Sequence, residues 1–385
     1  MKLSTTAIGR IVSGTFIALL IGLELALSAL GYGPKVRMEG DARFSVRLLP
    51  HQAVTLPFSK VSMPINGLGC RGPEWDPPAV GADGRPRRDP ALLRVAVLGH
   101  SVTLGGWEPW EESFCGVLER RLQDELDRAR DPRRALVMNF GGPSYNLACA
   151  QAAWEDLAHP FRPDYLVVPM FGVDIRPTRI GRPPEDYFLR RFIESTALHV
   201  LVARALGERD RIPSGRLTPE EEVQDARRAD LDRRVVENPF DPAFENLWST
   251  ARARLETMRA EQASDGGALV LVSMVELRDL FTPPGWERVS LRLEPWCEGR
   301  EAVLHADPYA RFLEASAPLR HELAEQGLPQ ERLWNTVRPP PEPPPLEHLD
   351  RSPFLFFSPG HYTTLGNRLV GDAIAEALIA DLERR

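Results

Sequence analysis

The 385-residue sequence has few cysteines and no excess of positive charge. Its four cysteines are far apart and form no C-x-x-C pair, which disfavours a structural zinc site and leaves one or two disulfides open; they are Cys70, Cys115, Cys149 and Cys297. The formal net charge is -7, whereas nucleic-acid binding needs a concentrated basic surface. We therefore expect no nucleic-acid partner and no structural zinc site, and no motif of the chain implies a cofactor.

The remaining composition is that of a globular protein with many loops. Hydrophobic residues make up 43% of the chain and charged residues 26%, beside 36 prolines. The length allows one α/β domain with additions at its ends.

An apolar run near the N-terminus is long enough to cross a membrane. Residues 11–33 carry one charge, Glu24, and as a helix they would reach roughly 34 Å. Three interpretations stay open: a retained membrane anchor, a signal peptide cleaved after small residues such as Ala26 and Ser28, and a buried helix. We favour the anchor, because the run is longer than a usual signal-peptide core.

The charges around this run do not settle its orientation. Lys2 and Arg10 precede it, but four cations also follow it, so the positive-inside rule does not favour an outside C-terminal domain; they are Lys35, Arg37, Arg43 and Arg47. We nevertheless expect an extracytoplasmic domain, periplasmic or at the cell surface.

The chain divides into an N-terminal segment, a connector and one large domain. We expect an anchor or signal segment over 1–34, an extended connector with one or two short strands over 35–90, and an α/β domain over 91–385. Within that domain, a charged insertion lies near 207–236 and a proline-rich loop at 338–345.

Short apolar runs alternate with longer helical patterns in the large domain. The strand candidates are 94–98, 135–139, 164–171 and 268–275, and the helix candidates are 114–128, 148–157, 240–261 and 365–382. Nearly continuous apolar strands are typical of parallel sheets that are buried on both faces. We therefore predict a three-layer α/β/α sandwich around a five-stranded, mainly parallel sheet.

Residues able to do chemistry follow the predicted strands. Ser101 comes after the first strand, Gly141 after the second and Asp174 after the third, while His361 precedes the last helix. Ligands bind at the carboxyl ends of parallel strands. Ser101 is thus a candidate nucleophile with His361 as its base, and the backbone N–H groups of Ser101 and Gly141 are candidate oxyanion donors.

These segments together resemble the SGNH (GDSL-type) hydrolases, in particular the bacterial members that begin with a membrane segment. "RVAVLGHSVTLGG" resembles their first block "GDSFTFG", "VMNFGGPSYN" is similar to the second block, "FGVDI" to the third and "GHYTTLGNRLVGDAI" to the last. "INGLGCRGPEW" resembles a stretch that precedes the domain in those members. The resemblance implies a serine ester hydrolase with Ser101 as nucleophile, Gly141 in the oxyanion hole and His361 as base.

The chain departs from the pattern of that family at three places. His100 stands where the family has an Asp, and Asp174 where it has an Asn. The positions that would hold the catalytic acid are Ser358 and Pro359. An ionised Asp174 would repel an oxyanion, whereas a protonated one, with its pKa raised by burial, could donate to it.

Three functions therefore remain open. The first is an esterase or acyl hydrolase acting on ester groups of an envelope carbohydrate or lipid. The second is a catalytically impaired protein that binds carbohydrate or assists polysaccharide modification. The third is a metal site built from His100, Asp174 and His361.

Four further residues are candidates for contacting substrate. They are His100, Gly142, Tyr145 and Trp107. Trp107 could line a sugar-binding cleft or pack under its loop, and Tyr145 could touch substrate or fill the start of a helix.

Overall fold

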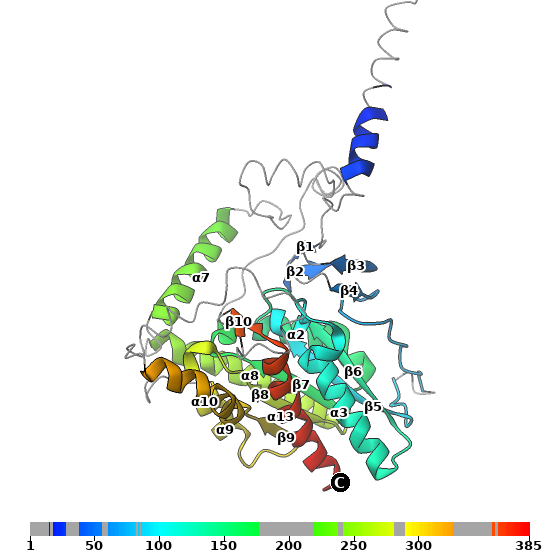
Figure 1. The fold of residues 1–385 in the computed structure, drawn as a ribbon, viewed down its shortest axis with the longest axis vertical. Coiled ribbons are helices and arrows are strands. Elements are labelled where there is room, and N and C mark those ends of the chain that lie inside the picture. Colours follow the sequence, from blue (N-terminus) through cyan, green and yellow to red (C-terminus); the bar gives the residue numbers. More distant parts are fainter. Residues whose placement is uncertain are drawn as a thin grey trace, which may run out of the picture.

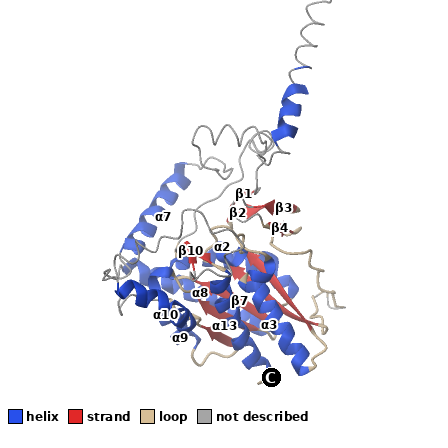
Figure 2. Ribbon diagram, in the orientation of Figure 1, coloured by secondary structure: helices blue, strands red, loops and turns tan. Residues whose placement is uncertain are grey.

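The computed structural model describes nine stretches of the chain and two single residues. They are 18–27, 38–55, 61–81, 86–176, 219–237, 242–280, 289–325, 356–358 and 361–385, with Thr15 and Gly84. The proline-rich loop 338–345 and the first part of the charged insertion lie outside them. Figure 2 shows helices on both faces of a central sheet.

The central sheet has five strands, all parallel, which confirms the predicted α/β class. Their order is β6-β5-β7-β8-β9. The strands are β5 (Leu92–Gly99), β6 (Arg134–Gly141), β7 (Tyr165–Met170), β8 (Ala268–Ser273) and β9 (Val303–Ala306). In register, Gly99 pairs with Gly141, so these two strands end side by side. The segments that follow the strands therefore meet at one edge.

Helices cover both faces of this sheet, and each face has its own apolar core. On one face lie α3 (Phe114–Ala129), α10 (Tyr309–Glu325) and α13 (Thr364–Leu382). On the other lie α4 (Leu147–Ala153), α8 (Pro242–Ser264) and α9 (Ser290–Cys297). Figure 1 shows α3 and α13 packed side by side. The alternating apolar residues of each strand supply the two cores, as the three-layer prediction requires.

The connector is more ordered than the prediction of one or two short strands. It forms four strands in two antiparallel pairs: β1 (Met38–Asp41) with β2 (Ser45–Leu48), and β3 (Gln52–Thr55) with β4 (Ser62–Ile65). Leu48, Met63 and Ile65 from these strands form a small core with Leu104 of α2 (Ser101–Leu104). The connector thus packs directly on the segment that follows β5, near the top of the sheet in Figure 1.

Three other predictions have outcomes in the fold. The charged insertion contains the helix α7 (Pro219–Glu237), whose side chains are largely exposed where they are described. All four cysteines are free thiols, so the disulfides left open above do not form. None of the helices in the described residues is both long enough and apolar enough to span a bilayer.

Candidate active site

The first block forms a sharp turn between β5 and α2. β5 ends at Gly99, whose φ of +134° is a conformation that residues with side chains rarely adopt. α2 begins at Ser101 and stops after one turn at Gly105, which is left-handed with a φ of 63°. Ser101 is partly exposed, at the edge of the sheet where ligands of parallel sheets bind.

His361 contacts the hydroxyl of Ser101. Ser101 Oγ lies 2.9 Å from His361 Nε2, although 260 positions separate the two residues. His361 opens the short strand β11 (His361–Tyr362), which pairs with β10 (Phe356–Ser358). The Tyr362 hydroxyl fixes this strand, because it donates to Val275 O at 2.8 Å and accepts from the Val275 N–H at 3.0 Å. The structure thus brings together the candidate nucleophile and the candidate base that the sequence predicts.

Burial favours the neutral form of the His361 ring. It lowers the pKa of His361 below its ordinary value, so the imidazole is free to accept a proton near neutral pH. The ring of Trp107 meets it edge-on, with centroids 6.2 Å apart and planes at 74°. Trp107 is partly exposed, so the structure places this candidate cleft residue beside His361.

His100 is buried and caps the helix that carries Ser101, which corrects its prediction as a substrate contact. Its Nδ1 accepts the Val102 N–H at 3.2 Å, so the neutral ring carries its proton on Nε2. The ring stacks on Phe171 with centroids 4.7 Å apart. Burial, and then the nearby His361, lower the pKa of His100 to about 3. The ring is therefore neutral.

Asp174 faces His100, so the two departures from the family pattern contact each other. Asp174 Oδ2 lies 3.6 Å from His100 Nε2 and accepts the Phe171 N–H at 2.6 Å. Burial raises the pKa of Asp174 to about 8, helped by the carboxylate of Glu276 and opposed by the Phe171 hydrogen bond and Arg176. Asp174 is thus mainly protonated at pH 7. The contact joins two neutral groups and is no ion pair.

The second block packs against the turn between β5 and α2. The oxyanion donor predicted at Gly141 is not observed. The Gly141 N–H donates to Asn139 Oδ1 at 2.9 Å, so it is not aimed at a substrate. A Cβ on Gly141 would lie 2.6 Å from Leu104 N. Gly142 donates to Gly99 O at 3.0 Å, and a Cβ there would overlap the ring of Tyr145. Both glycines thus allow the second block to approach its neighbours closely.

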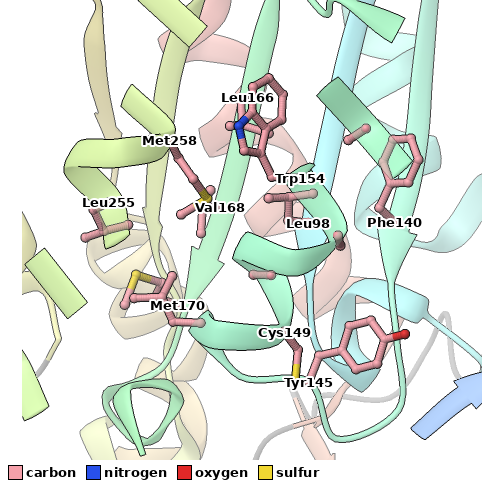
Figure 3. Close-up of a cluster of buried hydrophobic side chains, with 14 of the residues drawn as sticks. Leu98, Phe140, Tyr145, Cys149, Trp154, Leu166, Val168, Met170, Leu255 and Met258 are labelled. Carbon is pink, nitrogen blue, oxygen red and sulfur yellow. The ribbon is translucent and has the colours of Figure 1, made fainter. Parts of the chain in front are cut away.

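Tyr145 belongs to the core, which corrects its prediction as a substrate contact. Only 8% of it is exposed, and its ring lies 5.5 Å from that of Phe44. Figure 3 shows it next to Cys149 in the cluster under α4. Of the two interpretations given for Tyr145, the filling of the helix start is the one observed.

A buried arginine of the connector holds the loop after α2, and the sequence assigned it no role. Arg71 is only 2% exposed. Its guanidinium donates to the carbonyl groups of Leu104 at 3.1 Å, Glu108 at 2.7 Å and Gly105. This loop carries Trp107, so Arg71 positions one wall of the site.

Glu108 is a second buried group in this loop. It is 4% exposed, and burial raises its pKa to about 7, against the opposing charge of Arg71. Arg71 lies in the stretch "INGLGCRGPEW", which the family resemblance singled out without a function, whereas Glu108 lies outside every stretch that the resemblance covers.

The metal alternative finds no support in the described part of the chain. No group of three or more His, Cys, Asp or Glu residues is placed there to hold an ion. His100 uses one ring nitrogen to cap α2, and His361 Nε2 faces Ser101.

Neither a family model nor a curated protein matches the chain. Among solved structures, Axe2, an acetylxylan esterase from Geobacillus stearothermophilus, is 12% identical with a TM-score of 0.38, covering 74% of this chain and 93% of that one. The lipase Lip_vut3 from a goat rumen metagenome is 11% identical with a TM-score of 0.38, covering 74% and 97%. An alpha/beta hydrolase enzyme from the metagenome of Lake Arreo, Spain, is 13% identical with a TM-score of 0.34, covering 74% and 94%. Similarities this low do not identify the reaction that the chain catalyses.

Proposed function

We propose that the protein is a serine ester hydrolase of the SGNH type, with Ser101 as nucleophile and His361 as general base. The 2.9 Å contact between Ser101 Oγ and His361 Nε2 carries this proposal. The pair lies at the edge of a parallel sheet, and its base is held neutral by burial. These are the properties that nucleophilic catalysis by a hydroxyl requires.

The proposed reaction has two steps. In the first, His361 Nε2 takes the Ser101 proton while Oγ attacks the ester carbonyl, and the imidazolium then protonates the departing alcohol. In the second, a water molecule activated by His361 attacks the acyl-serine and releases the acid. Within the part of the chain that the structure describes, the Ser101 N–H has no hydrogen-bond acceptor. It is therefore the first oxyanion donor of the proposal.

Asp174 is the second donor of this proposal, in its protonated form. Below a pH of about 8 its carboxyl group is neutral and can donate, and above that pH it is ionised and accepts only. The kcat/KM for a short aryl ester is therefore expected to fall as the pH rises through about 8. Asp174→Asn should remove that fall, because an amide donates at every pH. Rate profiles of both proteins test this.

The same variant has a stability signature that serves as its control. The unfolded carboxyl loses its proton near pH 3.9, while the folded one keeps it up to about pH 8. Between these values the unfolded chain binds fewer protons, so the free energy of unfolding of the wild type declines with rising pH. Melting curves of Asp174→Asn should lack that decline. If the melting curves of Asp174→Asn lack the decline but the kcat/KM of the wild type stays constant across the alkaline range, Asp174 is not a donor.

We propose ester groups of an envelope carbohydrate or lipid as substrate class. The partly exposed Trp107 beside His361 supports a sugar or another flat ligand. We also propose that residues 11–33 tether the protein to a membrane, which their apolar sequence supports. An extracytoplasmic location of the domain is proposed with it, because an envelope substrate would require it.

A catalytically impaired binding protein is the second candidate function. It is favoured by the burial of His100 and by the Gly141 N–H, which is used within the protein. Such a protein would keep the cleft and bind the glycan without hydrolysing it.

Hydrolysis of a short aryl acetate by the full chain separates the two functions. We expect turnover that disappears in Ser101→Ala and persists in Ser264→Ala, which changes an exposed serine at the end of α8. Equal rates in Ser101→Ala and the wild type would remove Ser101 from the mechanism. No turnover in the folded wild type would favour the binding protein.

A further inference from the structure

The buried contact between His100 and Asp174 leaves one polar atom without a partner. The two residues are 6% and 7% exposed. Among the described residues, none forms a hydrogen bond with His100 Nε2, and Asp174 Oδ2 lies 3.6 Å from this atom. A buried N–H that has lost water without gaining an acceptor is rare in proteins, because it is costly. Oδ2 is the acceptor at hand for Nε2.

The orientation of the His100 ring is fixed from two sides. Nδ1 accepts the Val102 N–H at 3.2 Å, so the proton of the neutral ring is on Nε2. The flat side of the ring stacks on Phe171, with centroids 4.7 Å apart. The N–H of the ring therefore faces Asp174, and the ring has little freedom to turn away.

Two N–H groups converge on the same oxygen of Asp174. The Phe171 N–H donates to Oδ2 at 2.6 Å, and the His100 Nε2–H approaches this oxygen as well. At 3.6 Å the second contact is longer than a hydrogen bond, and contacts between catalytic groups are often long without substrate and tighten when it binds. In a protonated carboxyl group one oxygen accepts and the other carries the proton. Because Oδ2 accepts, the proton belongs on Oδ1.

We propose that His100 is a positioning residue for Asp174: its Nε2–H donates to Oδ2 and thereby keeps the acid proton of Asp174 on Oδ1. The inference rests on the proposed function, in which that Oδ1–H donates to the oxyanion. An amide has a fixed donor, whereas a carboxyl group needs a partner that decides which oxygen carries the proton. This need accounts for the joint presence of His100 and Asp174, where the SGNH pattern has an Asp and an Asn.

The groups around the pair keep their charge where Asp174 titrates. The charged or titratable groups that act on the pair are Glu276, Arg176, Tyr362 and His361. Glu276 acts as a carboxylate and Arg176 as a guanidinium cation. Burial raises the pKa of Tyr362 well above its ordinary value and lowers that of His361, so both are neutral as the pH passes through about 8. A protonation change near that pH is therefore that of Asp174.

Two substitutions of His100 separate its two contacts. His100→Asn keeps an acceptor close to the place of Nδ1, so it can cap α2, but its side chain is too short to reach Asp174. His100→Gln carries an amide N–H near the place of Nε2, so it can still donate to Oδ2, while it loses the cap. Each variant is the matched control of the other.

NMR titration of the Asp174 carboxyl carbon measures the effect directly. The full chain is labelled with carbon-13 in its aspartate carboxyl groups, and the Asp174→Asn variant identifies the signal by its loss. A donor to a carboxyl group stabilises the ionised form, so the loss of that donor raises the pKa. We expect a midpoint at a pH of about 8 in the wild type and in His100→Gln. In His100→Asn the midpoint should lie about one pH unit higher.

An unchanged or lower midpoint in His100→Asn would overturn the proposal, as would an equal rise in both variants. The wild type supplies a second readout if either variant fails to fold. The signal of the proton on His100 Nε2 should move downfield as Asp174 ionises, because hydrogen bonds to carboxylates are the stronger ones. A signal that stays constant through that pH range would also overturn the proposal.

The titration keeps this inference apart from the esterase proposal, because it requires no turnover. If the protein is an esterase, His100→Asn should also lower kcat about tenfold or more with little change in KM, and His100→Gln should restore most of the loss. The expected midpoints without any ester hydrolysis would leave His100 as the positioning residue for Asp174 and the proposed function wrong. Hydrolysis with equal midpoints in all three proteins would overturn the role of His100 alone.

Discussion

Replacing His361 with alanine is expected to lower kcat/KM for a short aryl ester by about 10⁴-fold. His361 Nε2 contacts Ser101 Oγ and is its proposed proton acceptor, and without it the hydroxyl stays a weak nucleophile. Removing a half-buried ring next to Trp107 also leaves a space of imidazole shape. Added imidazole should therefore restore part of the activity, as rate measurements over an imidazole series would show.

The structure offers a matched control for this variant. Ser273 Oγ and His305 Nε2 form a second serine–histidine contact, at 2.7 Å, between the neighbouring strands β8 and β9. Ser273 is only 2% exposed, so no ester reaches it. His305→Ala should keep nearly full activity. A His361→Ala protein as active as His305→Ala would exclude His361 as the base.

Arg71→Met is expected to lower the free energy of unfolding by about 3–5 kcal/mol. The guanidinium satisfies three backbone carbonyl groups of the loop after α2 and offsets the charge of the buried Glu108. A methionine of similar length leaves these groups without a donor in a site that excludes water. Chemical denaturation monitored by circular dichroism measures the loss.

Activity should fall together with stability in this variant, because the loop carries Trp107. Arg87→Met is the control, since Arg87 is an exposed arginine of the same connector, and it should change stability by less than about 0.5 kcal/mol. If Arg71→Met and Arg87→Met have the same free energy of unfolding, the connector does not support the site.

Local sequence pattern was enough to predict most of the central sheet and its helices. β5, β6, β7 and β8 each carry a continuous apolar run bounded by turn residues, and such runs are diagnostic of buried parallel strands. The fifth strand, β9, was expected but not located. It is four residues long, mostly half-buried and contains His305, so it has no such run.

The four-stranded connector was underestimated for a different reason. Its strands are four residues each and pair with one another in two small sheets. They are stabilised by contacts with distant residues, Leu104 and the loop held by Arg71. Such tertiary contacts leave little trace in the local pattern of polar and apolar residues.

The sequence was enough to predict that Ser101 and His361 come together, but not how the groups around them are oriented. Ser101 and His361 both lie at the ends of elements that a parallel sheet brings to one edge. The Gly141 N–H faces Asn139 and not a substrate, and this depends on the orientation of the backbone. His100 caps a helix and does not line a cleft, and this depends on the orientation of its side chain. The protonation state of Asp174 likewise depends on the burial of its carboxyl group, which lies beside the neutral His100.

Intact-mass analysis after treatment with a fluorophosphonate tests the central claim, an activated Ser101, most directly. The full chain should gain one adduct, and the Ser101→Ala chain treated in parallel should gain none. An unmodified wild type that is folded by circular dichroism, or an adduct that persists in Ser101→Ala, would contradict the account.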